Sequence, residues 1–120
     1  SVVDKSGNYI GGIIYPGLRV SLDSLSSKTA QLPSISLDIP KRVIGKNTID
    51  CMRSGIMYGN AAMLDGLIDR MEAELGEPAT LVATGGMSRF ITPLCTHKII
   101  YDADLLLRGL LILYRQNMTE

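Results

Sequence analysis

The stretch Ile44-Gly45-Lys46-Asn47-Thr48 leads from a turn into the longest periodic segment of the chain, residues 48–75. Apolar side chains recur through that segment at spacings of mostly four, which predicts an amphipathic helix. They are Met52, Ile56, Met63, Leu67, Met71 and Leu75. A threonine at a helix start caps backbone N–H groups with its hydroxyl. The same hydroxyl can instead face a ligand, because helix N-termini collect anions and polar acceptors.

Three glycines, Gly55, Gly59 and Gly66, lie inside this predicted helix. Each costs about 1 kcal/mol relative to alanine in a helix interior, so a compensating gain is expected. Two explanations stay open. The glycines either allow the close approach of a neighbouring helix, such as one from a dimer partner, or they mark a kink or break near Gly59-Asn60.

A second glycine-marked junction follows at Val82-Ala83-Thr84-Gly85-Gly86, where an apolar strand runs into a short helix that ends near Thr92. On local pattern alone, a tight turn that needs positive φ is the favoured interpretation. A double glycine also lets a ligand approach the backbone without meeting a Cβ atom. It is not a Walker A loop, because no Gly-Lys-Ser/Thr follows. Together, the two junctions favour a small-molecule or nucleotide site.

The remaining predicted elements give the order β-β-α-α-β-α-β-α, which indicates a mixed α/β layer architecture. They are strands at 1–5 and 9–15 in an antiparallel hairpin, a helix at 18–30, an extended connection at 32–41, a buried strand at 79–83, a strand at 97–100, and a helix at 102–117. Gly11-Gly12 predicts a bulge or a close backbone approach. Asp102 or Asp104 is expected in an acidic first turn of the last helix.

Composition excludes several function classes for this single domain of 120 residues. Twelve basic and twelve acidic residues cancel, which speaks against a nucleic-acid or anionic-membrane partner. Aromatic residues make up 5% with no tryptophan, so a stacking platform for single strands is not expected. No apolar run reaches the roughly 20 residues of a membrane-spanning helix. Cys51 and Cys95 are expected to be buried free thiols in a reducing cytoplasm.

Several polar residues have plain structural interpretations. Lys46 is expected to be a solvated turn lysine, and His97 to be at the surface or hydrogen-bonded rather than a metal ligand. Asp65 and Asp69, and likewise Arg70 and Glu74, are expected to lie on a solvated helix face.

Five motifs in a fixed order resemble type III pantothenate kinases over essentially the whole chain. They are Tyr9-Ile10-Gly11-Gly12-Ile13-Ile14-Tyr15-Pro16-Gly17, Lys28-Thr29-Ala30-Gln31-Leu32-Pro33, Ile44-Gly45-Lys46-Asn47-Thr48, Ser54-Gly55-Ile56-Met57-Tyr58-Gly59 and Ala83-Thr84-Gly85-Gly86. Each motif alone is weak evidence, whereas the ordered set is specific.

The resemblance implies the ribonuclease H-like fold of the actin-like ATPase (acetate and sugar kinase) superfamily, with a mixed sheet and flanking helices. It implies a cytoplasmic homodimer that transfers the γ-phosphoryl group of ATP to pantothenate in coenzyme A biosynthesis, using Mg²⁺ and K⁺ or NH₄⁺. Residues 1–120 resemble the C-terminal lobe only. The catalytic base, the first phosphate loop and the metal and cation ligands belong to the family's N-terminal half, so this chain alone is expected to be inactive.

The residue roles implied by the resemblance are few. Thr48 matches the threonine that contacts pantothenate in the partner's active site. Thr84, Gly85 and Gly86 match the adenosine side of the nucleotide site, and Gly17 lies in a loop near it. No catalytic or metal-binding residue is implied in this chain. Two alternatives stay open: an accessory transcriptional regulator of the same fold, and a non-catalytic dimerising fragment.

Overall fold

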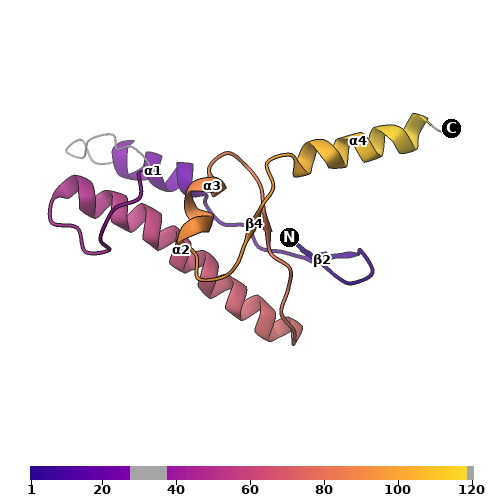
Figure 1. The fold of residues 1–120 in the computed structure, drawn as a ribbon, viewed down its shortest axis with the longest axis horizontal. Coiled ribbons are helices and arrows are strands. Elements are labelled where there is room, and N and C mark those ends of the chain that lie inside the picture. The colour runs from indigo at the N-terminus through magenta and orange to yellow at the C-terminus, as the bar shows by residue number, and fades with distance from the viewer. Residues whose placement is uncertain (28–37, 119–120) are drawn as a thin grey trace.

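The computed structural model describes residues 1–27 and 38–118. One long helix, α2 (Thr48–Leu75), runs through the molecule, and most other elements lie along it (Figure 1). Most of the predicted connection at 32–41, and the last three residues of the predicted helix at 18–30, fall outside the described residues.

Helix α2 has the predicted bounds and is continuous, so the break considered near Gly59-Asn60 is wrong. Its cap differs from the expectation. Asn47, with extended backbone angles, is the N-cap, and its side-chain oxygen accepts the Asp50 N–H at 2.9 Å. Thr48 is therefore the first helical residue rather than the cap. Gly76 ends the helix in the left-handed conformation with φ 76°, as C-terminal glycines commonly do.

The hydrophobic core lies where the first half of α2 meets α1 (Leu18–Ser27) and α3 (Ser88–Ile91). Its buried members are Leu18, Ile56, Met57, Ala61 and Ile91. The predicted apolar stripe is correct only at its start, because Met52 and Ile56 are buried whereas Met63, Leu67, Met71 and Leu75 are not. Further along, the buried side of α2 passes instead through Met57, Ala61 and Ile68.

The helical glycines are not packed closely within the described part of the chain. A Cβ atom added at Gly55, Gly59 or Gly66 would meet nothing within 4 Å. The neighbouring helix that these glycines predict is therefore not one of the described helices of this chain.

The hairpin at the N-terminus is confirmed with shorter strands, β1 (Val2–Val3) and β2 (Tyr9–Gly11), paired antiparallel. The register is irregular between Val2 and Val3, and a Cβ on Gly12 would lie 3.1 Å from the Ser1 Cα. Both the bulge and the close backbone approach predicted at Gly11-Gly12 are thus present. A second pair, β3 (Val82–Ala83) and β4 (Ile100–Tyr101), is parallel. The described residues form these two separate two-stranded sheets, where one mixed sheet was expected.

The strand predicted as buried at 79–83 is short, and Val82 is 47% exposed. A 3₁₀ turn, η1 (Thr92–Leu94), follows α3 and leads back toward β4. The last helix, α4 (Leu105–Met118), begins after Asp102 and Asp104, so neither carboxylate lies in its first turn. Asp102 instead forms an ion pair with Arg108 and accepts the Asp104 N–H.

Helix α4 projects away from the other elements and carries no buried residue (Figure 1). Its large apolar side chains are 43% to 70% exposed and occur on more than one side of the helix. They are Leu105, Leu106, Leu107, Leu110, Leu111, Ile112, Leu113, Tyr114 and Met118. No helix among the described residues is both long and apolar enough to cross a membrane.

Candidate functional site

The junction loop before α2, residues 39–46, is held against the first turns of the helix by three contacts. Ser54, itself buried, donates a hydrogen bond from its hydroxyl to the Val43 carbonyl. One turn later, the Tyr58 hydroxyl donates to the Pro40 carbonyl at 3.0 Å. Gly45 lies so close to the helix that an added Cβ would be 2.5 Å from the backbone nitrogen of Cys51. The loop conformation therefore requires glycine at this position.

This loop and the start of α2 line an open basic pocket of about 490 Å³. The size falls within the usual range for small-molecule sites. The basic pocket is lined by Ile39, Pro40, Lys41, Arg42, Ile44, Gly45, Lys46, Asp50 and Arg53. Four of these side chains are cationic and one is anionic, although the whole chain is neutral. The unpaired N–H groups at the start of a long helix add to the positive potential. The pocket thus suits an anion with an apolar portion.

Thr48 lies beside this pocket rather than in its wall. It follows Lys46 by two residues, its side chain is exposed, and its hydroxyl has no partner among the described residues. A partner outside the described residues can therefore reach it. Lys46 is exposed, as predicted for a turn lysine, but it also lines the basic pocket.

The second predicted site follows β3, where Thr84, Gly85 and Gly86 are all exposed. Gly85 has φ 100°, so the predicted positive-φ turn is present. The Gly85 carbonyl accepts hydrogen bonds from Ser88 Oγ at 2.9 Å and from the Tyr101 hydroxyl at 3.0 Å. Two elements, α3 and β4, therefore fix one peptide group of the turn.

The structure keeps these two sites apart. In Figure 1 the start of α2 lies at one end of the molecule, and the segment that leads into α3 lies near its middle. No residue lines the basic pocket and also belongs to the 84–86 turn. Among the described residues, the basic pocket and the 84–86 turn are thus two separate surfaces.

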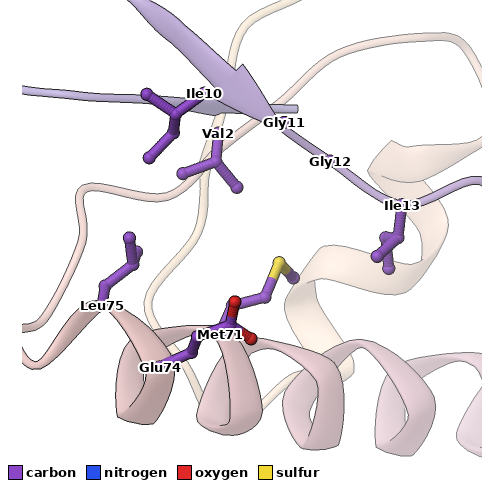
Figure 2. A pocket seen from close by; sticks show the side chains of 8 residues that line it. All are labelled: Val2, Ile10, Gly11, Gly12, Ile13, Met71, Glu74 and Leu75. Atoms are coloured by element: carbon purple, nitrogen blue, oxygen red, sulfur yellow. The ribbon is translucent and has the colours of Figure 1, made fainter.

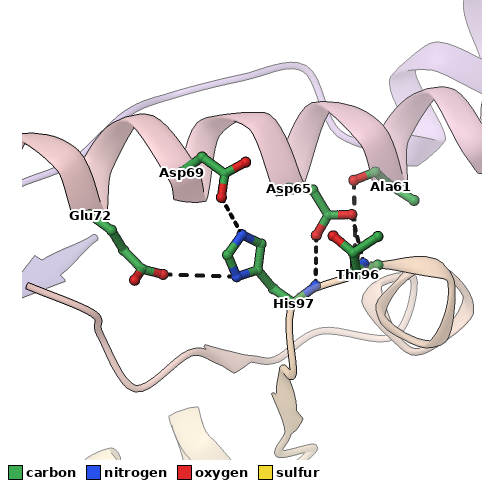
Figure 3. A network of polar contacts seen from close by, with 7 residues as sticks. Ala61, Asp65, Asp69, Glu72, Thr96 and His97 are labelled. Atoms are coloured by element: carbon green, nitrogen blue, oxygen red, sulfur yellow. Dashed lines mark hydrogen bonds and ion pairs between the residues drawn. The ribbon is translucent and has the colours of Figure 1, made fainter.

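A polar clamp joins α2 to the segment before β4 (Figure 3). Asp65 accepts the backbone N–H groups of Thr96 at 2.7 Å and of His97 at 3.1 Å. His97 Nε2 lies 2.6 Å from Asp69 Oδ1, and its Nδ1 lies 3.9 Å from a Glu72 carboxylate oxygen. The expectation that His97 is hydrogen-bonded is confirmed. The prediction that Asp65 and Asp69 only face solvent is wrong, because both carboxylates bind the segment before β4.

The clamp also changes two proton affinities. Partial burial tends to raise the pKa of Asp65, but the backbone N–H groups of Thr96 and His97 outweigh it and hold that pKa below its ordinary value. Burial, with the charge of Asp65 as a smaller cause, raises the pKa of the Cys95 thiol.

Cys51 and Cys95 are both free, as predicted, but Cys51 is exposed, so its predicted burial is wrong. The described residues contain no group of three His, Cys, Asp or Glu side chains suited to a metal ion.

A smaller pocket of about 160 Å³ lies between the hairpin and the end of α2 (Figure 2). Its walls are mostly apolar, with Val2, Ile10 and Ile13 above and Met71 and Leu75 below. Glu74 is the one charged residue among those lining it. It contains none of the predicted site residues and is smaller than typical ligand sites.

Four residues that shape the two surfaces were missed from the sequence: Ser54, Tyr58, Ser88 and Tyr101. Ser54 and Tyr58 lie on one helix face at i and i+4, one turn beyond the glycine loop, and that spacing is a signal that could have identified them. Ser88 follows the double glycine in the position where a hydroxyl bonds back to turn carbonyls. Tyr101 carries no local signal, because its partner is 16 residues away.

Comparison with known proteins gives a consistent result. A family model described as "Type III pantothenate kinase" matches residues 1–70. The type III pantothenate kinase of Zymomonas mobilis is 45% identical over 95% of this chain and 42% of its own length. Those of Rhodospirillum rubrum and Moorella thermoacetica are 43% and 44% identical, over 99% and 96% of this chain.

The chain spans 46% and 45% of the length of those last two relatives, so it corresponds to about half of each curated protein that it matches. The family model covers more than half of the chain. On that match, this chain belongs to the type III pantothenate kinase family.

Proposed function

We propose that the complete protein containing this chain phosphorylates pantothenate with ATP, the first step of coenzyme A biosynthesis. In this proposal residues 1–120 form the C-terminal lobe of a ribonuclease H-like, actin-like ATPase fold in the cytoplasm. The lobe supplies binding surfaces, and the other half of the enzyme supplies the base. Such a division suits phosphoryl transfer, which depends on positioning and charge stabilisation more than on covalent chemistry.

The basic pocket beside Thr48 is the observation that carries this proposal. Pantothenate is a carboxylate with hydroxyl groups and an apolar dimethyl carbon. Lys41, Arg42 and Lys46 supply positive charge, whereas Arg53 is paired with Asp50 at 3.7 Å. Ile39, Pro40 and Ile44 supply apolar wall. The Thr48 hydroxyl is exposed and has no partner among the described residues. It is available to donate to or accept from a polar group of this substrate, bound in the partner subunit's active site.

The 84–86 turn is proposed as the adenosine wall. Its three residues are exposed, and neither glycine carries a Cβ that would keep a flat base or ribose from the backbone. Among the residues that the structure describes, nothing lies within 4 Å of the Cβ positions of Gly85 and Gly86, which leaves space for a ligand.

Mg²⁺ and the monovalent cation, K⁺ or NH₄⁺, are proposed to bind to the other half of the enzyme. Among the described residues, no three His, Cys, Asp or Glu side chains come together as a divalent-metal site. No step of the reaction is therefore assigned to a metal bound here.

The open glycine face of α2 is proposed as the homodimer surface. Gly55 and Gly59 are exposed and one turn apart, with nothing packed over them in the described chain. Small residues at this spacing let a second helix approach closely and offset their cost in helix propensity. The dimer would then also carry Thr48, at the start of the same helix, toward the partner's active site.

Thr48→Val and Thr48→Ser in the complete enzyme test the proposal. Valine keeps the shape and removes the hydroxyl, so we expect the pantothenate KM to rise about 5- to 30-fold, equivalent to about 1–2 kcal/mol for one buried hydrogen bond. The ATP KM should stay within about twofold, and serine should restore most of the affinity.

Asn47→Ala is the matched control, because it removes the real cap and should cost about 1 kcal/mol of stability. If Thr48→Val lowers thermal stability as much as Asn47→Ala does and affects both substrates equally, the substrate role of Thr48 is wrong. An intact enzyme without pantothenate kinase activity would sink the proposed function and favour the regulatory alternative.

A further inference from the structure

The Gly85 carbonyl is held by two hydroxyl groups from different elements. The Tyr101 hydroxyl reaches it from β4 at 3.0 Å, and Ser88 Oγ reaches it from the first turn of α3 at 2.9 Å. Ser88 has one proton to donate and also lies 2.9 Å from the Thr84 carbonyl, so it divides its bond between the two acceptors. Tyr101 is therefore the donor dedicated to Gly85.

The neighbouring strand fixes where the tyrosine hydroxyl can lie. Ala83 pairs with Tyr101 in the parallel β3–β4 register, and the Asp102 N–H donates to the Ala83 carbonyl at 2.8 Å. The tyrosine backbone is thus tied to the strand that leads directly into the turn. Gly85 lies only two residues beyond Ala83, so the Tyr101 ring can reach its carbonyl from β4.

A peptide group is planar and trans, so its N–H points opposite to its C=O. The described backbone contains no cis peptide. When the two hydroxyls draw the Gly85 carbonyl toward β4 and α3, the Gly86 N–H must point away from them. That N–H has no acceptor among the described residues, and Gly86 is exposed. A free backbone donor is thereby presented on the outer side of the turn.

We propose that Tyr101 and Ser88 are positioning residues of the nucleotide site, which orient the Gly85–Gly86 peptide so that the Gly86 N–H donates to an oxygen of the bound nucleotide. This inference rests on the proposed nucleotide role of residues 84–86. The ligand chemistry is an acceptor oxygen of ribose or phosphate. The glycine at 85 is required because its φ of 100° is strained for other residues.

The test uses Tyr101→Phe, Ser88→Ala and the double variant in the complete enzyme. Each single change removes one of two donors, and we expect the ATP KM to rise about 3- to 10-fold, the effect of one weakened hydrogen bond. Because either donor alone partly retains the peptide orientation, the double variant should lose more than the product of the two single effects. The pantothenate KM should not change. Tyr9→Phe, at an exposed tyrosine of the N-terminal hairpin, is the matched control and should leave both KM values as they are.

Two readouts separate positioning from simple folding damage. The affinity of the enzyme for ADP, measured by titration, should fall in step with the ATP KM. Equal rises in both substrate KM values, accompanied by a lower Tm, would overturn the positioning role. So would a double variant with unchanged ATP KM.

Gly86→Val distinguishes this inference from the proposed function itself. A Cβ at position 86 meets nothing within 4 Å among the described residues, and its φ lies outside the left-handed region. The backbone therefore accepts a side chain there, and the added bulk obstructs a ligand. A raised ATP KM in Gly86→Val with no effect of Tyr101→Phe or the double variant overturns the inference and leaves the nucleotide site standing. An unchanged ATP KM in Gly86→Val removes the nucleotide assignment, and the inference fails with it.

Discussion

Replacing Gly45 with alanine should displace the junction loop from α2 and reshape the basic pocket. The added Cβ would lie 2.5 Å from the Cys51 nitrogen and 2.7 Å from the Asp50 carbonyl carbon. Ordinary contact begins near 3.4 Å, so restoring it requires a movement of the loop by about 0.9 Å. The atoms that it meets belong to helix backbone, which cannot turn aside as a side chain would.

The displacement predicts both a stability cost and a selective kinetic defect. Overpacking of this kind costs about 1–3 kcal/mol, which lowers the Tm by several degrees. A misplacement near 1 Å can cost about 100-fold in rate, so we expect kcat/KM for pantothenate to fall about 10- to 100-fold. The ATP KM should stay within about twofold, because the 84–86 turn lies elsewhere in the molecule.

The assay is steady-state ADP release by the complete enzyme, with each substrate varied in turn, together with thermal melting. Gly66→Ala is the control, since a Cβ there, in the second half of α2, meets nothing within 4 Å among the described residues. Unchanged pantothenate kinetics and an unchanged Tm in Gly45→Ala would refute the claim that the loop is pressed against the helix start.

Two further outcomes follow from the clamp and the thiols. Asp65 has a lowered pKa in the folded state, so its stabilising effect is complete above the ordinary value of 3.8 and is lost as pH falls through the lower folded value. Asp65→Asn should therefore cost about 1 kcal/mol near neutral pH, and the Tm difference from wild type should shrink below about pH 4; a difference that grows in acid would contradict this. With a disulfide reagent at pH 8, exposed Cys51 should give the fast phase and half-buried Cys95, whose pKa is raised, the slow one. Loss of the slow phase rather than the fast one in Cys51→Ser would be the contrary result.

Features set by neighbouring residues were predicted well from the sequence. The bounds of α2 follow from its period and from the signals at its ends, and the hairpin irregularity follows from Gly11-Gly12. The choice of cap was wrong because Asn47 and Thr48 are both good N-cap residues. The structure selects Asn47, whose amide also donates to the Asp50 carboxylate at 2.9 Å.

Features set by distant residues could not be predicted in the same way. Asp65 meets Thr96 and His97 across 31 and 32 positions, and nothing in the local pattern of α2 distinguishes it from a solvated carboxylate. The apolar stripe failed beyond Ile56 for a related reason. A helix of 3.6 residues per turn drifts away from a spacing of four, so the side that packs on α1 and α3 changes along its length.

The sequence predicted which two segments carry the candidate sites, but not which side chains gather around them. Both glycine-marked junctions exist, but the cations around the first one gather only when residues 39–46 fold back on α2. The strands were predicted too long because each one pairs with a single short partner among the described residues, and residue propensity does not show where that pairing ends.

Because its leucines are exposed, α4 gains no stability from packing against the other described elements of this chain. A helix of 14 residues is marginal in water unless another surface shields its apolar sides. Formation of α4 is therefore thermodynamically coupled to its burial against another surface. Melting data on the isolated chain would accordingly describe a different equilibrium from the one that governs the enzyme, and substitutions at these leucines would behave as interior mutations only in the larger molecule.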